Sequence, residues 1–132
     1  MTGSIEKLFQ DVEISLNILR VLASNSYDSI LITDATKDAK IIYANKAFKT
    51  LTGYDPSEVI GKTPKILQGA ATDKTVIARL VDALKGDGRF EGKAVNYKKN
   101  GTPFIMDWRV LPVKVGKRTR VWVAIQREGF AI

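Results

Sequence analysis

The sequence predicts a single α+β domain, in which helices are grouped between two sets of strands. Short β-rich runs at 29–33 and 40–44 flank a turn-like segment, which indicates an antiparallel hairpin. A helical pattern of apolar residues follows over 72–85, and three more β-rich runs lie at 90–97, 104–113 and 118–126. The 132 residues are enough for one such core and too few for two ordinary domains.

The N-terminal segment is expected to form one amphipathic helix over 4–24, with Ser4 as a candidate N-cap. Its apolar residues follow an alternating three-four spacing, close to the a/d seam of a coiled coil. Phe9, Leu16 and Val21 lie off that seam. The helix therefore packs on its own sheet, or pairs with a second copy, or does both. The seam consists of Ile5, Leu8, Val12, Leu19 and Leu22.

Short helices are expected between the first hairpin and the long helix. Asn45 can cap a helix that Gly53 ends, and Pro56 suits the first position of another that Gly61 ends. The turn between the third and fourth strands contains Asn100-Gly101, a strong hairpin signal.

The long helix is expected to begin at Thr72 or Asp73 and to end at Gly86. Its apolar stripe would face the sheet. Gly116-Lys117 marks the turn before the last strand.

Cysteine and histidine are both absent from the chain. This excludes disulfides, thiolate nucleophiles, the usual zinc sites, imidazole acid–base catalysis and histidine-ligated haem. The carboxylates form no recognisable catalytic motif, so we expect the domain not to be an enzyme and to hold no metal.

The net charge of +7 is spread along the chain, with no basic block and no DNA-binding motif. We therefore expect a solvated surface and no nucleic-acid partner. No apolar run approaches the ~20 residues of a membrane span. No signal peptide is visible, so the expected location is cytoplasmic, without a membrane partner.

Three stretches resemble the PAS sensor family and, within it, the light-oxygen-voltage (LOV) branch. They are Ile42–Phe48 with Leu51-Thr52-Gly53-Tyr54, Gly61–Gly69, and Asn96–Phe104. The resemblance runs from about Tyr27 to Gln126. It implies a five-stranded antiparallel sheet in the order 2-1-5-4-3, with helices on one face. It also implies a sensor domain over 27–128, preceded by a dimerisation or signalling helix within 1–26.

LOV photoreceptors carry a flavin-reactive cysteine within an Asn-Cys-Arg-Phe-Leu-Gln-Gly run. The matching positions here run from Thr63 to Gly69 and read Thr-Pro-Lys-Ile-Leu-Gln-Gly, so Pro64 stands at the cysteine position. Because proline has no thiol, the resemblance implies that no cysteinyl-flavin adduct forms.

The resemblance also makes a flavin, FMN or FAD, a candidate cofactor. Gln68, Asn96 and Gln126 match three polar flavin contacts of that family. An amide both donates and accepts hydrogen bonds, which suits the flavin edge. Amides at these positions also occur in PAS domains without a cofactor, where they bind the backbone.

Four positions depart from the LOV pattern and weaken that expectation. Thr63 and Met106 replace asparagines that contact the ring. Lys65 keeps the charge of a phosphate-binding arginine but loses its bidentate fork, and Val81 loses the charge of a second one.

The expected function is signal sensing and relay by a PAS domain within a larger bacterial-type signalling protein, such as a two-component system. The expected partners are a second copy of the chain and an effector domain or signalling protein. Two alternatives stay open: a flavin-based redox or light sensor acting by electron transfer, and a ligand-free dimerisation module. Trp108 and Trp122 are assigned either to the core or to an interface.

Overall fold

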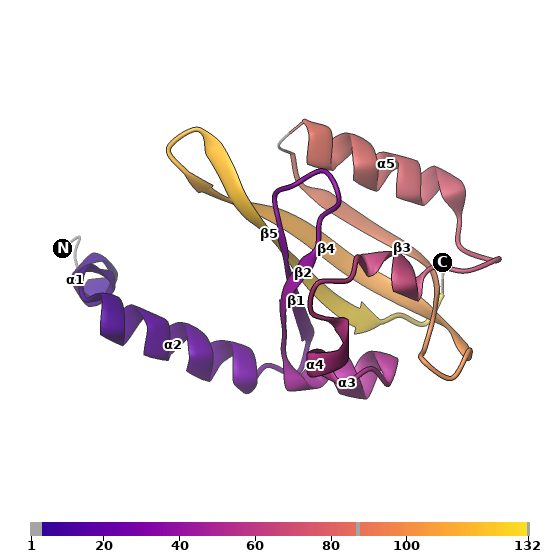
Figure 1. Ribbon diagram of the computed structural model, residues 1–132, viewed down its shortest axis with the longest axis horizontal. Coiled ribbons are helices and arrows are strands. Elements are labelled where there is room, and N and C mark those ends of the chain that lie inside the picture. Colours follow the sequence, from indigo (N-terminus) through magenta and orange to yellow (C-terminus); the bar gives the residue numbers. More distant parts are fainter. Residues whose placement is uncertain (1–3, 87, 132) are drawn as a thin grey trace.

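The computed structural model describes residues 4–86 and 88–131, without the side chains of Ser4 and Leu8. Its sheet has five antiparallel strands in the order β2-β1-β5-β4-β3, which confirms the expected topology. Helices α3, α4 and α5 and a short 3-10 helix, η1, lie on one side of the sheet, and the N-terminal helices extend away from it (Figure 1). The strands are β1 (Ser29–Asp34), β2 (Ile41–Ala44), β3 (Phe90–Tyr97), β4 (Pro103–Val115) and β5 (Arg118–Glu128). The helices are α1 (Ser4–Gln10), α2 (Val12–Ser24), α3 (Lys46–Thr52), α4 (Pro56–Val59), η1 (Pro64–Leu67) and α5 (Lys74–Lys85).

The hydrophobic core lies between the helices and the inner face of the sheet. Strand residues alternate between the two faces, so every second side chain is buried over 104–110 of β4 and over 122–126 of β5. Phe48 of α3, Val59 of α4 and Leu67 of η1 close the core from the helical side. The buried strand residues are Leu31, Ile41, Ala44, Phe90, Ala94, Phe104, Met106, Trp108, Val110, Trp122 and Ala124.

The two short helices begin and end as their cap residues predict. The Asn45 side chain accepts from the Phe48 amide at the start of α3, and Gly53 ends that helix with a left-handed φ of 81°. Asp55 caps α4, and its hydrogen bond from the Ser57 hydroxyl is the main cause of its lowered pKa.

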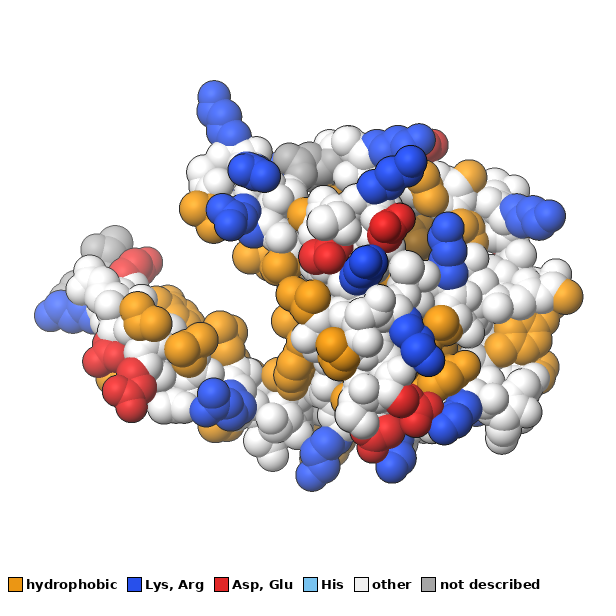
Figure 2. All heavy atoms as spheres, in the orientation of Figure 1, with side chains coloured by type: hydrophobic (Ala, Val, Ile, Leu, Met, Phe, Trp, Pro, Cys, Tyr) orange, Lys and Arg blue, Asp and Glu red, His pale blue; other side chains and the backbone are white. Residues whose placement is uncertain are grey.

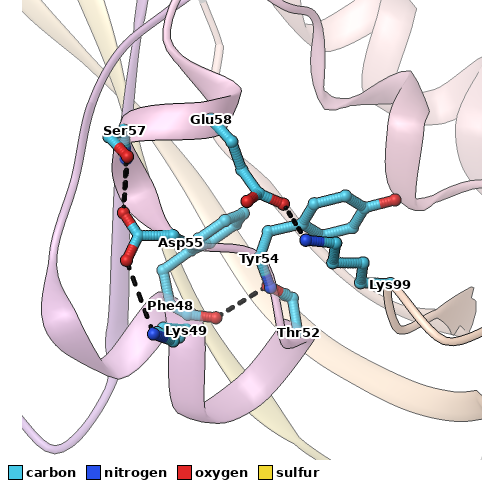
Figure 3. A network of polar contacts seen from close by, with 8 residues as sticks. All are labelled: Phe48, Lys49, Thr52, Tyr54, Asp55, Ser57, Glu58 and Lys99. Atoms are coloured by element: carbon cyan, nitrogen blue, oxygen red, sulfur yellow. Dashed lines mark hydrogen bonds and ion pairs between the residues drawn. The ribbon is translucent and has the colours of Figure 1, made fainter.

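A surface network ties these helices to the turn between β3 and β4 (Figure 3). The Lys99 ammonium lies 2.8 Å from a Glu58 carboxylate oxygen, and Glu58 raises the pKa of Lys99. The Lys99 amide also donates to the Thr52 carbonyl at 2.8 Å. These two contacts therefore connect α3 and α4 to the turn between β3 and β4.

The expectation of a single helix over 4–24 is wrong, because the chain breaks at Asp11. This residue is extended, with φ −87° and ψ 112°, and its carboxylate accepts from the Ile14 amide at 3.1 Å. The apolar spacing continues across the break, whereas the cap satisfies the first amides of α2 and so favours a new helix start. The expected Ser4 cap falls outside the described side chains.

None of the described residues of α2 is buried, so within one chain this helix does not pack on its own sheet. In the part of the chain that is described, no helix has the length and apolar character to cross a membrane.

Candidate functional site

Two adjoining cavities lie between the helices and the sheet. The larger encloses about 470 Å³ and is walled by the β1–β2 turn, η1 and α5. The smaller, of about 60 Å³, lies deeper against the inner strands. Both cavities are lined by Ala39, Pro64, Leu80, Leu84 and Trp122.

The residues expected at a ligand site divide between these spaces. Thr63, Lys65 and Gln68 line the larger cavity. Gln126 lines the smaller one. The remaining two, Asn96 and Met106, line neither cavity and contact each other instead.

Asn96 has an incomplete set of hydrogen bonds inside the core. Its side-chain NH₂ donates to the Met106 sulfur at 3.2 Å, and sulfur is a weak acceptor. Its Oδ1 is buried and has no hydrogen-bond partner among the described residues. A buried acceptor left unpaired costs about 1–3 kcal/mol, so this atom is the one most in need of a donor.

Gln126 connects the smaller cavity to the start of β1. Its Oε1 accepts from the Ser29 hydroxyl at 3.0 Å, and both residues are buried. Next to Ser29, the Asp28 carboxylate pairs with Arg127 at 2.7 Å and raises the pKa of that guanidinium. Two side chains of β5, those of Gln126 and Arg127, therefore bind the chain where the segment after α2 meets β1.

Asn45 is a connecting residue that the sequence identified only as a helix cap. Its Nδ2 donates to the carbonyls of Ala23, at 2.9 Å, and Asp28, at 3.1 Å. Its Oδ1 accepts from the amides of Ile30 and Phe48. One buried amide thus joins α2, the following linker, β1 and α3. The cap was visible as a local pattern, whereas the other contacts depend on the path of the chain.

The β1–β2 turn is a well-ordered wall of the larger cavity. One Asp34 carboxylate oxygen accepts from the Thr36 hydroxyl at 2.6 Å and from the Thr36 and Lys40 amides. These bonds, the Thr36 hydroxyl foremost, lower the pKa of Asp34. Ala39 in the same turn has a φ of 50°, an uncommon conformation for a residue other than glycine.

Both tryptophans belong to the inner face of the sheet. Trp108 and Trp122 are each 6% exposed and line the smaller cavity, so neither lies on the outer face as an interface residue. The Trp108 ring packs on Phe90 with a centroid distance of 5.0 Å. The structure therefore settles this open choice in favour of the core.

Among the described residues, no group of acidic side chains is arranged to hold a metal ion.

The profile of the PAS domain family matches residues 28–128. The chain belongs to the PAS domain family. Its five-stranded sheet and helical layer are those of a PAS domain.

Known relatives assign this PAS domain to the LOV branch. It is 41% identical over 96 residues to phototropin-2 of Oryza sativa, a match that covers 72% of this chain and 10% of that protein. A solved LOV domain from the blue-light activated histidine kinase of Erythrobacter litoralis is 31% identical, with a TM-score of 0.75, covering 79% of this chain and 97% of that one. A LOV domain studied with a flavin analogue is 26% identical, with a TM-score of 0.79, over 86% and 85% of the two chains. The chain therefore spans about a tenth of phototropin-2 and corresponds to a single sensory domain.

The described residues fit a flavin in part. Gln126 and the unpaired Oδ1 of Asn96 provide amides of the kind that a flavin edge can bind. The space beside Gln126 is only about 60 Å³, whereas small-molecule sites commonly enclose about 300–1,000 Å³. Trp108 and Trp122 line this small space, and a tricyclic ring does not fit into it.

Proposed function

We propose that this PAS domain senses a change at its cavity and relays it to the rest of a larger, cytoplasmic, bacterial-type signalling protein. Its similarity to the LOV domain of a blue-light activated histidine kinase supports a role in signal transduction. In this proposal residues 27–128 form the sensor and residues 1–26 the signalling helix. The chain itself carries no catalysis, and an effector domain or partner protein acts on the signal.

The observation that carries this proposal is a chain of hydrogen bonds from the cavity to α2. Gln126 lines the smaller cavity and binds Ser29. The neighbouring Asp28 carbonyl binds the Asn45 amide, and the same amide binds the Ala23 carbonyl in the last turn of α2. A change at Gln126 therefore reaches the helix through buried groups that have few alternative partners.

Hydrogen–deuterium exchange of residues 12–28 tests this relay. Gln126→Leu removes the acceptor of the Ser29 hydroxyl, and Asn45→Ala removes the amide that donates to the Ala23 carbonyl of α2 and to the Asp28 carbonyl. We expect both variants to exchange faster at the end of α2, because a buried hydrogen bond stabilises by about 0.5–1.5 kcal/mol. That free energy corresponds to an exchange rate about two to thirteen times higher.

Asn100→Ala, at an exposed turn of the sheet, is the matched control and should leave this segment unchanged. Unchanged exchange of α2 in Gln126→Leu, with the sheet still folded, would contradict the relay.

We also propose that the sensor works without a cysteinyl-flavin adduct. The proposal is supported by Pro64 at the start of η1 and by a chain that contains no cysteine. Proline offers no thiolate to attack a flavin.

A homodimer through the N-terminal helices is part of the proposed function. Leu19 and Leu22 are more than half exposed on α2. Figure 2 shows hydrophobic side chains along the N-terminal helices and on the flank of the domain that faces them, with an open gap between. An exposed apolar surface of this kind is typical of a protein–protein contact.

Two other functions have an observation of their own in favour. The unpaired Oδ1 of Asn96 favours a flavin-based redox or light sensor, in which a bound flavin supplies electron-transfer chemistry. In that case Asn96, Gln126, Met106 and Thr63 would lie at the ring, and Lys65 and Gln68 nearer the ribityl chain and phosphate. The bulk of Trp108 and Trp122 favours a ligand-free dimerisation module instead.

A further inference from the structure

Most of the open space of this domain lies in the larger cavity. Trp122 lines both cavities, as do Pro64 and Leu84, so these residues lie between the smaller cavity and the larger one. At about 470 Å³ the larger cavity falls within the range of small-molecule sites. A ligand would therefore lie between the β1–β2 turn, η1 and α5, against the outer side of Trp122.

Three lysines surround this cavity, each from a different element. Lys37 comes from the β1–β2 turn, Lys65 from η1 and Lys85 from the end of α5. Among the described residues of the lining Asp38 is the only acidic one, so these four charges sum to +2. In the described part of the chain none of the three lysines forms an ion pair. Their charges are therefore available to an anion.

The inner surface of the cavity is apolar. Ile77, Leu80, Val81 and Leu84 lie along one side of α5, and the Trp122 ring lies opposite. A hydrocarbon chain that binds in this space is removed from contact with water. Burial of each CH₂ group stabilises the complex by about 0.8 kcal/mol. The site thus combines an apolar interior with a cationic rim.

We propose that the larger cavity binds an apolar monocarboxylate, with its hydrocarbon body on Trp122 and α5 and its carboxylate at the lysine rim. A carboxylate suits this rim better than a phosphate. The lysines act as separate point charges, and Asp38 would repel the second charge of a dianion, so a single negative charge suits this rim. The inference rests on the proposed function in one respect only, that the cavity is where this sensor meets its signal.

Isothermal titration with octanoate and with 1-octanol tests the proposal. The two probes have the same chain and differ in charge. We expect octanoate to bind and 1-octanol to bind more weakly. A Lys65→Gln, Lys85→Gln double variant should weaken octanoate binding about two- to thirtyfold and leave 1-octanol unchanged, since partly exposed ion pairs are each worth little. Lys46→Gln, an exposed lysine outside the cavity, is the matched control.

Filling the cavity is the second arm of the test. Val81 lines the cavity and is 42% exposed, so Val81→Trp should abolish octanoate binding without unfolding the protein. Val115→Trp, on an exposed end of β4, should bind as the parent does.

Absence of octanoate binding to the parent, equal binding of the two probes, or full binding by Val81→Trp would overturn the proposal. The relay is judged separately, by the exchange of α2 in Gln126→Leu, so failure of one does not imply failure of the other.

Discussion

At the scale of single residues, the site depends on where buried amides find partners. Asn45 and Gln126 both join elements that are distant in sequence. Asn96, in contrast, pairs only with the Met106 sulfur and keeps an unpaired oxygen. An asparagine at the Met106 position would offer a stronger acceptor and a donor as well. Because Met106 is a weak partner, a ligand with a hydrogen-bond donor would improve the hydrogen bonding of Asn96 more than that of Asn45 or Gln126.

Pro64 gives the prediction that belongs to this scale. When the protein is loaded with flavin and illuminated with blue light, we expect no thiol adduct, because no residue of the chain carries a thiol. Absorbance spectra check this through the blue flavin band and the near-ultraviolet band that replaces it in an adduct. Pro64→Cys, loaded in the same way, should gain the reversible adduct. Absence of the adduct in a flavin-loaded Pro64→Cys would show that Pro64 does not stand at the cysteine position.

At the scale of elements, the break at Asp11 separates two helices that the apolar spacing had joined. Asp11→Ala removes the side chain that accepts from the Ile14 amide. Loss of an N-cap costs about 0.5–2 kcal/mol, so the first turn of α2 should exchange its amides about two to thirty times faster. Glu13→Ala, a carboxylate in the same turn without a capping role, should have a much smaller effect. Equal exchange in the two variants would mean that Asp11 does not hold this helix start.

The strands could be predicted from sequence because their signals are local. Alternating burial along β4 and β5, and glycines with positive φ in both turns that flank β4, follow from the pattern of residue types. The helix break and the role of Asn45 could not be found in this way. Asp11 interrupts no apolar period, and the partner of Asn45 in α2 lies 22 residues away.

The candidate site was predictable only in part, for the same reason. Motif positions identified Lys65 and Gln68, which do line the larger cavity. They did not identify Lys37 or Lys85, which join that cavity only because the β1–β2 turn folds toward α5. Lys85 lies four residues after Val81, one helical turn on, and this spacing was the available signal.

At the scale of the whole molecule, two apolar surfaces have no partner within one chain. One is α2, and the other is the outer face of the sheet. There Ile30 lies beside Ile125, and Ile32 beside Val123, which in turn lies beside Leu111. These strand residues are half-buried, and no described helix covers them. A second copy can cover both surfaces at once if the helix of each chain lies on the sheet of the other, whereas pairing of the two helices would cover only α2.

The dimer therefore gives the last prediction, which is that Leu19→Asp with Leu22→Asp shifts the protein to monomer. Burying a Leu side chain is worth about 1.5–3 kcal/mol, and an unpaired carboxylate in the same contact costs more than that gain. Light scattering after size exclusion measures the mass, and Asn17→Asp, which adds one negative charge to the polar side of α2, is the control. A parent that is already monomeric at micromolar concentration would exclude the dimer. A double variant that keeps the dimeric mass would exclude a dimer through α2, because the contact would then lie elsewhere on the molecule.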